Sequence, residues 1–212
     1  MIGTKNLDTL PTIDNLRRLT QSLAMLDAIL MPDWQWRYYS YNSKWSDSAA
    51  MASMRNGSGD DFFILFTTAG AIIGGIGHES EMNVEGQWPG VIDSVPAVFS
   101  DFTNEPAFSV PHMTFCLWRL TDSPAWEIGP IKFPDGPDPD GSSDLLYILD
   151  GDPSTYYYWA ASYYEKNCNI GAITAIYNHE PLTPEIVGAL NPEITINDLA
   201  EDVMEIGYPI SH

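Results

Sequence analysis

The sequence predicts an α+β fold, a mostly antiparallel sheet with packed helices in a single domain of residues 1–212. Three observations support this prediction. Apolar runs follow one another across short glycine-containing links, which is typical of hairpins and therefore of antiparallel pairing. Segments with helical spacing of apolar residues lie between these runs. Hydrophobic residues make up 44% of the 212 residues, which is enough to bury one core.

The first expected element is an N-terminal helix of residues 13–31. Its leucines recur at steps of three and four positions, which puts them on one helical face: Leu16, Leu19, Leu23, Leu26 and Leu30. Thr12 has the side chain of an N-cap residue, and Pro32 ends the pattern. We expect this helix to pack on the sheet.

Seven short strands are expected after this helix. Alternation at Trp34, Trp36 and Tyr38 predicts a strand with one aromatic face. A short glycine-containing link joins the strands expected at 62–67 and 71–76 into a hairpin. The remaining expected strands are 113–120, 125–129, 145–149 and 172–177.

Helices are also expected between and after the strands. Apolar residues at helical spacing predict a helix at 91–102. A cap residue followed by proline, at 152–153 and again at 183–184, predicts two helix starts. The last helix is expected to begin near Asn197.

This last helix has two distinct faces. Leu199, Val203 and Ile206 form an apolar stripe that we expect to pack on the domain. Its carboxylates share the opposite face: Asp198, Glu201, Asp202 and Glu205. That face either stays solvated or serves as a docking face for Lys and Arg residues of a partner.

The charge of the chain is strongly negative and unevenly distributed. Asp and Glu number 29 against 9 Lys and Arg, which gives a formal net charge of −20. Residues 1–60 hold equal numbers of acids and bases, so the strongly acidic portion 61–212 carries the whole excess. Such a charge maintains solubility, and it can also steer a basic protein partner. It argues against nucleic acid and anionic membranes as partners.

Targeting and redox signals are weak in this sequence. The first residues lack the basic and apolar regions of a signal peptide, so we expect a cytoplasmic protein. The apolar stretch 62–76 is shorter than a membrane span. Cys116 and Cys168 lack the close spacing of a disulfide framework and are expected to be reduced.

One cluster could support metal or acid–base chemistry. Histidine and carboxylates on a loop can bind zinc or transfer protons, and the candidates are His78, Glu79, Glu81 and His112. They lack the spacing of a known zinc motif. The aspartates of residues 135–141 resemble a calcium loop that lacks its first ligand and its bidentate Glu. We therefore predict no catalytic residue, metal or cofactor, with a metal-dependent hydrolase around His78 as an alternative.

Aromatic residues concentrate in two segments, 34–45 and 156–164. On the expected strand, Tyr39 and Tyr41 lie on the face opposite the tryptophans, and on the expected helix Tyr158 turns away from the apolar stripe. The sequence therefore predicts exposed aromatics, which are favoured at protein interfaces, although an unusually large core is an equal alternative.

The combination of small size, acidity, α+β pattern and spare Trp and Tyr resembles a bacterial immunity protein of the polymorphic-toxin kind. This resemblance implies an inhibitor that neutralises a basic toxin, since an acidic surface both steers to and blocks a basic cleft. A DNA-mimic protein of the antirestriction type would use the same negative field and is an alternative. The resemblance transfers no site residue, and the oligomeric state stays open.

Overall fold

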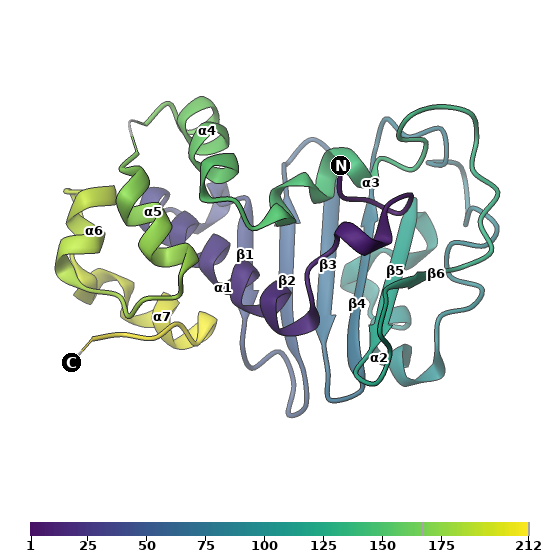
Figure 1. Ribbon diagram of the computed structural model, residues 1–212, viewed down its shortest axis with the longest axis horizontal. Helices are drawn as coiled ribbons and strands as arrows, with labels where there is room; N and C mark the ends of the chain where they lie inside the picture. The colour runs from purple at the N-terminus through teal and green to yellow at the C-terminus, as the bar shows by residue number, and fades with distance from the viewer. Residues whose placement is uncertain (167, 212) are drawn as a thin grey trace.

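The computed structural model describes residues 1–166 and 168–211 and contains one six-stranded antiparallel sheet with helices packed against it (Figure 1). Each strand pairs with the next one along the chain, so the sheet is a simple meander. The strands are β1 (Tyr39–Asn42), β2 (Ala50–Arg55), β3 (Asp61–Phe66), β4 (Gly70–Ile76), β5 (Phe115–Leu120) and β6 (Glu127–Ile128). The predicted α+β fold with a mostly antiparallel sheet is confirmed.

The α-helices gather mainly beside β1 and over one face of the sheet (Figure 1). They are α1 (Ile13–Leu30), α2 (Ser100–Thr103), α3 (Ser142–Leu146), α4 (Pro153–Tyr163), α5 (Ile170–Tyr177), α6 (Pro184–Leu190) and α7 (Ala200–Ile206). Short 3-10 segments are η1 (Leu7–Thr9), η2 (Trp34–Trp36), η3 (Ala97–Phe99), η4 (Pro106–Phe108), η5 (Val110–His112), η6 (Tyr147–Asp150) and η7 (Ile196–Leu199).

The larger core lies between α1 and the sheet. The predicted N-cap is present, because the Thr12 hydroxyl accepts a hydrogen bond from the Asn15 amide. The leucine stripe of α1 is buried, and it shares one apolar cluster with Tyr41, Ile64 and Ile73 of the sheet. The apolar face of α1 thus accounts for its position, since burying it removes a continuous stripe from water.

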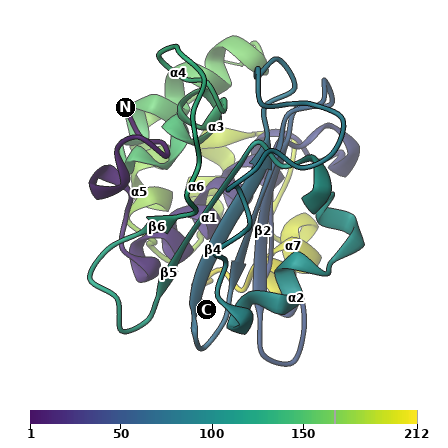
Figure 2. The same ribbon diagram turned by 90° about the vertical axis from the view of Figure 1, so that its right-hand side faces the viewer.

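A second core lies on the other face of the sheet. The long connection between β4 and β5 covers this face with Phe99, Phe102 and Met113, which pack against Phe63 and Ile72 of the sheet. Figure 2 shows α2 and its flanking loops on the side of the sheet opposite α1. Both sheet faces are therefore buried over β3 to β5, which explains the continuous apolar runs of these strands.

The structure corrects the expected strand around Trp34. Residues Trp34–Trp36 form a 3-10 turn, because Asp33 accepts the Gln35 amide and starts helical geometry there. The strand begins only at Tyr39, and β2 follows it without having been predicted. Met51 and Met54 of β2 are separated by the two small residues Ala52 and Ser53, so no period of two marks the strand.

Two further expected strands are helices. The stretch 172–177 belongs to α5, whose N-cap Asn169 accepts the Ala172 amide. The stretch 145–149 is divided between α3 and η6. Short apolar runs do not distinguish a strand from a buried helix, and at α5 the Asn169 cap marks the helix start.

Other boundaries differ in extent only. The helix expected at 91–102 is helical from Ala97 to Thr103, and the strand expected at 125–129 pairs only at Glu127–Ile128. The helices expected after the two cap–proline pairs are α4 and α6, and the one expected near Asn197 is η7 with α7. Among the described residues, no helix is long and apolar enough to cross a bilayer.

Candidate functional site

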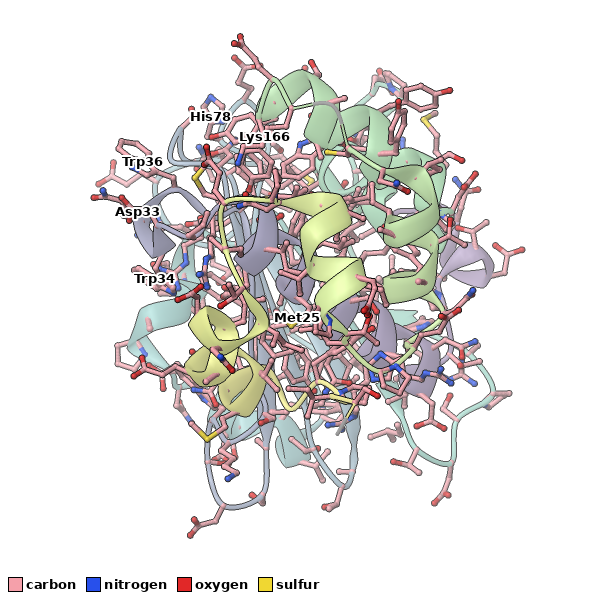
Figure 3. The ribbon with its side chains drawn as sticks, turned by 90° about the vertical axis from the view of Figure 1, so that its left-hand side faces the viewer. Met25, Asp33, Trp34, Trp36, His78 and Lys166 are labelled. Carbon is pink, nitrogen blue, oxygen red and sulfur yellow. The ribbon has the colours of Figure 1, made fainter. Side chains whose placement is uncertain are left out.

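Two tryptophans of η2 are strongly exposed. Trp34 and Trp36 expose 63% and 60% of their surface, although tryptophan is usually well buried. Asp33 holds this turn, since its carboxylate accepts the Gln35 amide at 3.3 Å and the Gln35 side-chain amide at 2.8 Å. Figure 3 shows the side chains of Asp33, Trp34 and Trp36 at the outline of the molecule. The tryptophans are thus presented to solvent by an ordered turn.

Arg37 ties this turn to two neighbouring elements. Its Nη1 and Nη2 donate to the two carboxylate oxygens of Asp202 in α7, at 2.5 and 3.3 Å. Its Nε donates to the carbonyl of Met31 at 2.8 Å, and Nη2 also donates to the carbonyl of Pro32 at 2.9 Å. Because a bidentate guanidinium–carboxylate pair restricts both side chains, Arg37 fixes the turn against α7.

A groove runs beside this turn, and we call it the Trp34 groove. It consists of two adjoining hollows of about 140 and 230 Å³. Both hollows are lined by Trp34, Arg37, Ser40 and Arg55. The smaller one also contacts Trp45, Met51, Asp202 and Glu205. The groove therefore joins exposed aromatic rings of η2 and of the β1–β2 turn to the predicted acidic helix.

The acidic face of the last helix is present but divided. Asp202 pairs with Arg37, and Asp198 accepts hydrogen bonds from the Thr195 amide and hydroxyl at 2.8 and 2.7 Å. The hydrogen bond from the Thr195 backbone amide lowers the pKa of Asp198, and the hydrogen bond from the Thr195 hydroxyl lowers it further. Glu201 and Glu205 are exposed and make no ion pair with the described residues. The expected apolar stripe is buried, at Leu199, Val203 and Ile206.

The expected exposure of Tyr39 and Tyr41 is wrong. Their exposed fractions are only 5% and 3%, because β1 begins at Tyr39 and directs both side chains toward the core under α1. Tyr158 is 71% exposed, in agreement with its predicted position on α4, but it does not line the Trp34 groove. The helix cap at Asp33 was the signal that could have placed the tryptophans outside.

A buried carboxylate lies behind β1. Asp27 of α1 accepts four hydrogen bonds, from the amides of Tyr38 and Tyr39 at 2.9 and 2.8 Å and from the hydroxyls of Tyr156 and Tyr164 at 2.6 and 2.9 Å. Burial raises the pKa of Asp27 to about 6, although these bonds partly oppose the shift. Asp27 was not among the residues predicted from the sequence, although it stands as a lone acid between Leu26 and Ala28.

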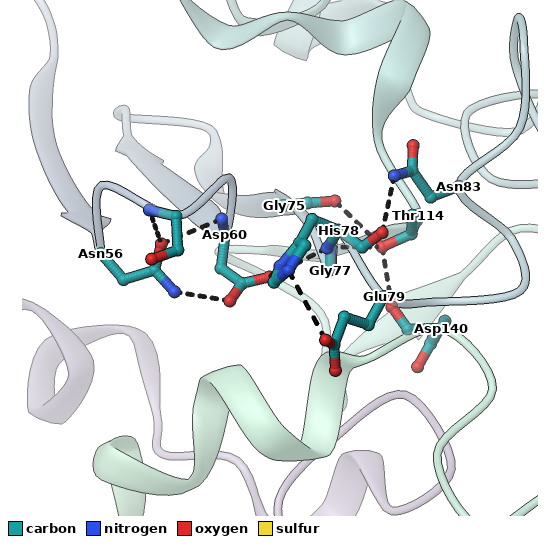
Figure 4. A network of polar contacts seen from close by, with 10 residues as sticks. Asn56, Asp60, Gly75, Gly77, His78, Glu79, Asn83, Thr114 and Asp140 are labelled. Carbon is teal, nitrogen blue, oxygen red and sulfur yellow. Dashed lines mark hydrogen bonds and ion pairs between the residues drawn. The ribbon is translucent and has the colours of Figure 1, made fainter.

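His78 forms a polar network with the turn before β3 (Figure 4). Its Nδ1 lies 2.7 Å from Oδ1 of Asp60, which also accepts the His78 amide at 2.9 Å. Asn56 donates to the other oxygen of Asp60, and Glu79 lies 3.8 Å from Nε2 of His78. The hydrogen bond with Asp60 raises the pKa of His78. Burial would raise the pKa of Asp60, but the bonds from His78 and Asn56 together outweigh it and lower that pKa.

The metal candidates do not converge. Among residues 1–166 and 168–211, no group of three or more His, Cys, Asp and Glu side chains could hold a metal ion. Glu81 and His112 therefore do not join His78 and Glu79 in a ligand set. Two aspartates of the calcium-like loop hold the start of α3: Asp138 accepts the amides of Ser143 and Asp144, and Asp140 accepts the amide of Ser142.

Comparison with known proteins gives no functional lead. No family model, no curated protein and no solved structure matches this chain. The candidate site therefore rests on its own geometry, and the Trp34 groove is the feature that combines exposed aromatics, ordered backbone and charge.

Proposed function

We propose that this chain is a protein-binding module that docks a basic protein on the Trp34 groove and the neighbouring acidic side chains of α7. The observation that carries the proposal is the exposure of Trp34 and Trp36 on a turn held by Asp33 and Arg37. Trp is enriched among the residues that dominate interface energies, and an ordered turn loses little entropy on binding. Burying such rings would supply most of the binding energy.

The charge balance supports a basic partner. In the described part of the chain, Arg37 is the only Lys or Arg residue whose side chain lies within ion-pair distance of a carboxylate, that of Asp202. Most of the 29 acids are therefore not neutralised internally. A field of this sign accelerates encounter with a basic protein and slows encounter with an acidic one. An inhibitor of a basic toxin in the cytoplasm is the role that fits this chemistry.

The alternatives account for less of the structure. A DNA mimic would use the negative field but would leave two exposed tryptophans without a task. A metal-dependent hydrolase around His78, Glu79 and Glu81 has no ligand set among the described residues. A basic protein partner uses both the charge and the aromatic groove.

A displayed library of random linear peptides tests this proposal. The library is selected on the wild-type protein, with counter-selection on the Trp34→Ser/Trp36→Ser variant. We expect the enriched peptides to combine net positive charge with an apolar residue. A synthetic enriched peptide should lose at least about tenfold in affinity for the double variant, as expected for hot-spot residues.

The matched control is Tyr158→Ser, which removes a similarly exposed aromatic outside the groove. This variant should bind the peptide within about twofold of wild type. Enrichment of net-negative peptides, or equal binding by the wild type and the double tryptophan variant, would contradict the proposal.

A further inference from the structure

We propose that a hollow between the start of α1 and the turns that follow β3 and β5 binds a phosphate group, either as free orthophosphate or on a small phosphoester. We call it the arginine hollow, because Arg17 and Arg119 both line it. Its volume is about 340 Å³. It shares no lining residue with the Trp34 groove, so this inference does not depend on the proposed function.

The sheet register brings the two arginines to the same end of the sheet. Phe66 of β3, Ala71 of β4 and Arg119 of β5 lie opposite one another in a single row. Side chains that are opposite in an antiparallel sheet point to the same face, and Phe66 and Ala71 belong to the core under α1. The guanidinium of Arg17 lies 4.7 Å from the centre of the Phe66 ring. Arg17 of the helix thus stands over the row in which Arg119 lies two strands away.

Neither arginine is neutralised within the described chain. Both are partly buried, yet no described carboxylate lies within ion-pair distance of either guanidinium. Arg119 donates from Nε to the carbonyl of Ser123 at 3.1 Å, and Arg17 makes one long bond from Nη1 to the Tyr41 hydroxyl at 3.5 Å. Arginines that lose contact with water are usually paired with an acid, and this chain has 29 acids. Two unpaired arginines in one hollow therefore point to an external anion.

Hydroxyl groups of the hollow also suit an oxyanion. The Thr12 hydroxyl lines the hollow and accepts the Asn15 amide, which leaves its own proton free to donate. Thr68 also lines the hollow, and among the described residues it bonds through its carbonyl, which accepts the Thr121 hydroxyl at 3.1 Å. Hydroxyl and guanidinium donors together match the several oxygens of a phosphate group.

The charge of the hollow favours a phosphate over a carboxylate. Asp14 also lines it, is exposed and lies outside ion-pair distance of both arginines, so two positive charges face one negative charge. A phosphate monoester carries a charge of about −1.5 to −2 near pH 7, which two arginines can share. A carboxylate carries a single charge and is satisfied by one guanidinium fork. The volume is at the lower end of small-molecule sites, which leaves room for the organic part of an ester.

Isothermal titration calorimetry at constant pH and ionic strength tests this inference with orthophosphate, glycerol phosphate and acetate as probes. We expect one-to-one binding of a phosphate probe and at least about fivefold weaker binding of acetate. Tighter binding of glycerol phosphate than of orthophosphate identifies a phosphoester as the ligand class. Tighter binding of orthophosphate identifies the free ion.

Three variants connect this binding to the hollow. Arg119→Gln should weaken phosphate binding by at least about tenfold, because it removes one of the two cations. Asp14→Asn removes the competing carboxylate at an exposed position and should tighten binding by about threefold. The matched control Lys132→Gln removes a positive charge at an exposed position outside the hollow and should bind within about twofold of wild type. Circular dichroism verifies the fold of each variant.

Four outcomes would overturn the inference. The first is the absence of saturable binding of both phosphate probes to the wild type, and the second is acetate binding as tight as phosphate binding. The third is an equal loss of affinity in Arg119→Gln and Lys132→Gln, which would assign the effect to net charge. The fourth is unchanged phosphate affinity in folded Arg119→Gln; if that variant does not fold, unchanged affinity in Asp14→Asn decides in the same way.

Discussion

Asp27 connects three elements through one buried carboxylate. It accepts two amides of the segment that enters β1 and two tyrosine hydroxyls of the α4 region, and it is fully buried. The two amides can only donate, and both hydroxyls donate in this arrangement, so the side chain must offer two acceptor oxygens. A carboxyl group supplies both, although burial makes its charged form costly.

The first prediction concerns Asp27→Asn. The amide group of asparagine would face a donor at one of these bonds, and we expect a loss of about 1–3 kcal/mol in the free energy of unfolding. Urea denaturation followed by circular dichroism measures this loss. Tyr158→Phe, at an exposed hydroxyl, is the control and should leave stability unchanged.

The pH dependence of this loss gives a second check. The pKa of Asp27 is raised from 3.8 to about 6 on folding, so its proton stabilises the folded state most below 3.8. That contribution is lost as pH rises through about 6. The deficit of Asp27→Asn should therefore shrink between about pH 4 and about pH 7 and stay constant at higher pH. A deficit that grows with pH would contradict this assignment.

At the scale of single elements, β4 requires its paired glycines for close packing. A Cβ at Gly75 would lie 2.6 Å from the carbonyl oxygen of Asp61 in β3 and closer still to the ring of Phe115 in β5. The contact with the backbone carbonyl is not possible without movement of the sheet. Gly75 is thus explained by crowding against the neighbouring strands, and Gly74 by crowding against Met113 and Phe102 of the second core.

The next prediction compares two alanine substitutions. Gly75→Ala should destabilise the protein by about 1–3 kcal/mol, because the added methyl group overpacks the sheet. Gly188→Ala, in the exposed part of α6 with nothing within 4 Å of its Cβ, should stabilise it by about 0.5–1 kcal/mol. Thermal unfolding of both variants measures the two effects. A stable Gly75→Ala variant would show that β4 can shift.

At the scale of the whole molecule, uncompensated charge opposes folding. The net charge is −20, and a single Lys or Arg ion pair occurs within the described residues. Repulsion among the remaining carboxylates is weaker in the expanded unfolded chain, so it lowers the stability of the compact state. Screening by salt should relieve part of this repulsion.

We therefore expect the melting temperature to rise when sodium chloride increases from low to physiological ionic strength. The rise should level off once the Debye length falls to about 8 Å. Potassium chloride should act alike, because the effect is one of ionic strength. A melting temperature that falls with salt would indicate that attractive ion pairs outweigh repulsion.

The sequence alone determined features that depend on local pattern and composition. The leucine stripe of α1, the cap–proline starts of α4 and α6 and the β3–β4 hairpin were predictable, because capping chemistry and periodicity act over a few residues. The same holds for the charge and for the apolar stripe of α7. These features established the fold class before any tertiary contact was known.

Only the tertiary structure decided which aromatic and acidic residues are free to bind. Tyr41 became a core residue because α1 covers its strand, and Trp34 became exposed because a capped turn precedes that strand. The charge of Asp202 is neutralised by an ion pair with Arg37, which is 165 positions away along the chain. Burial and ion pairing of this kind depend on long-range packing, which local periodicity does not encode.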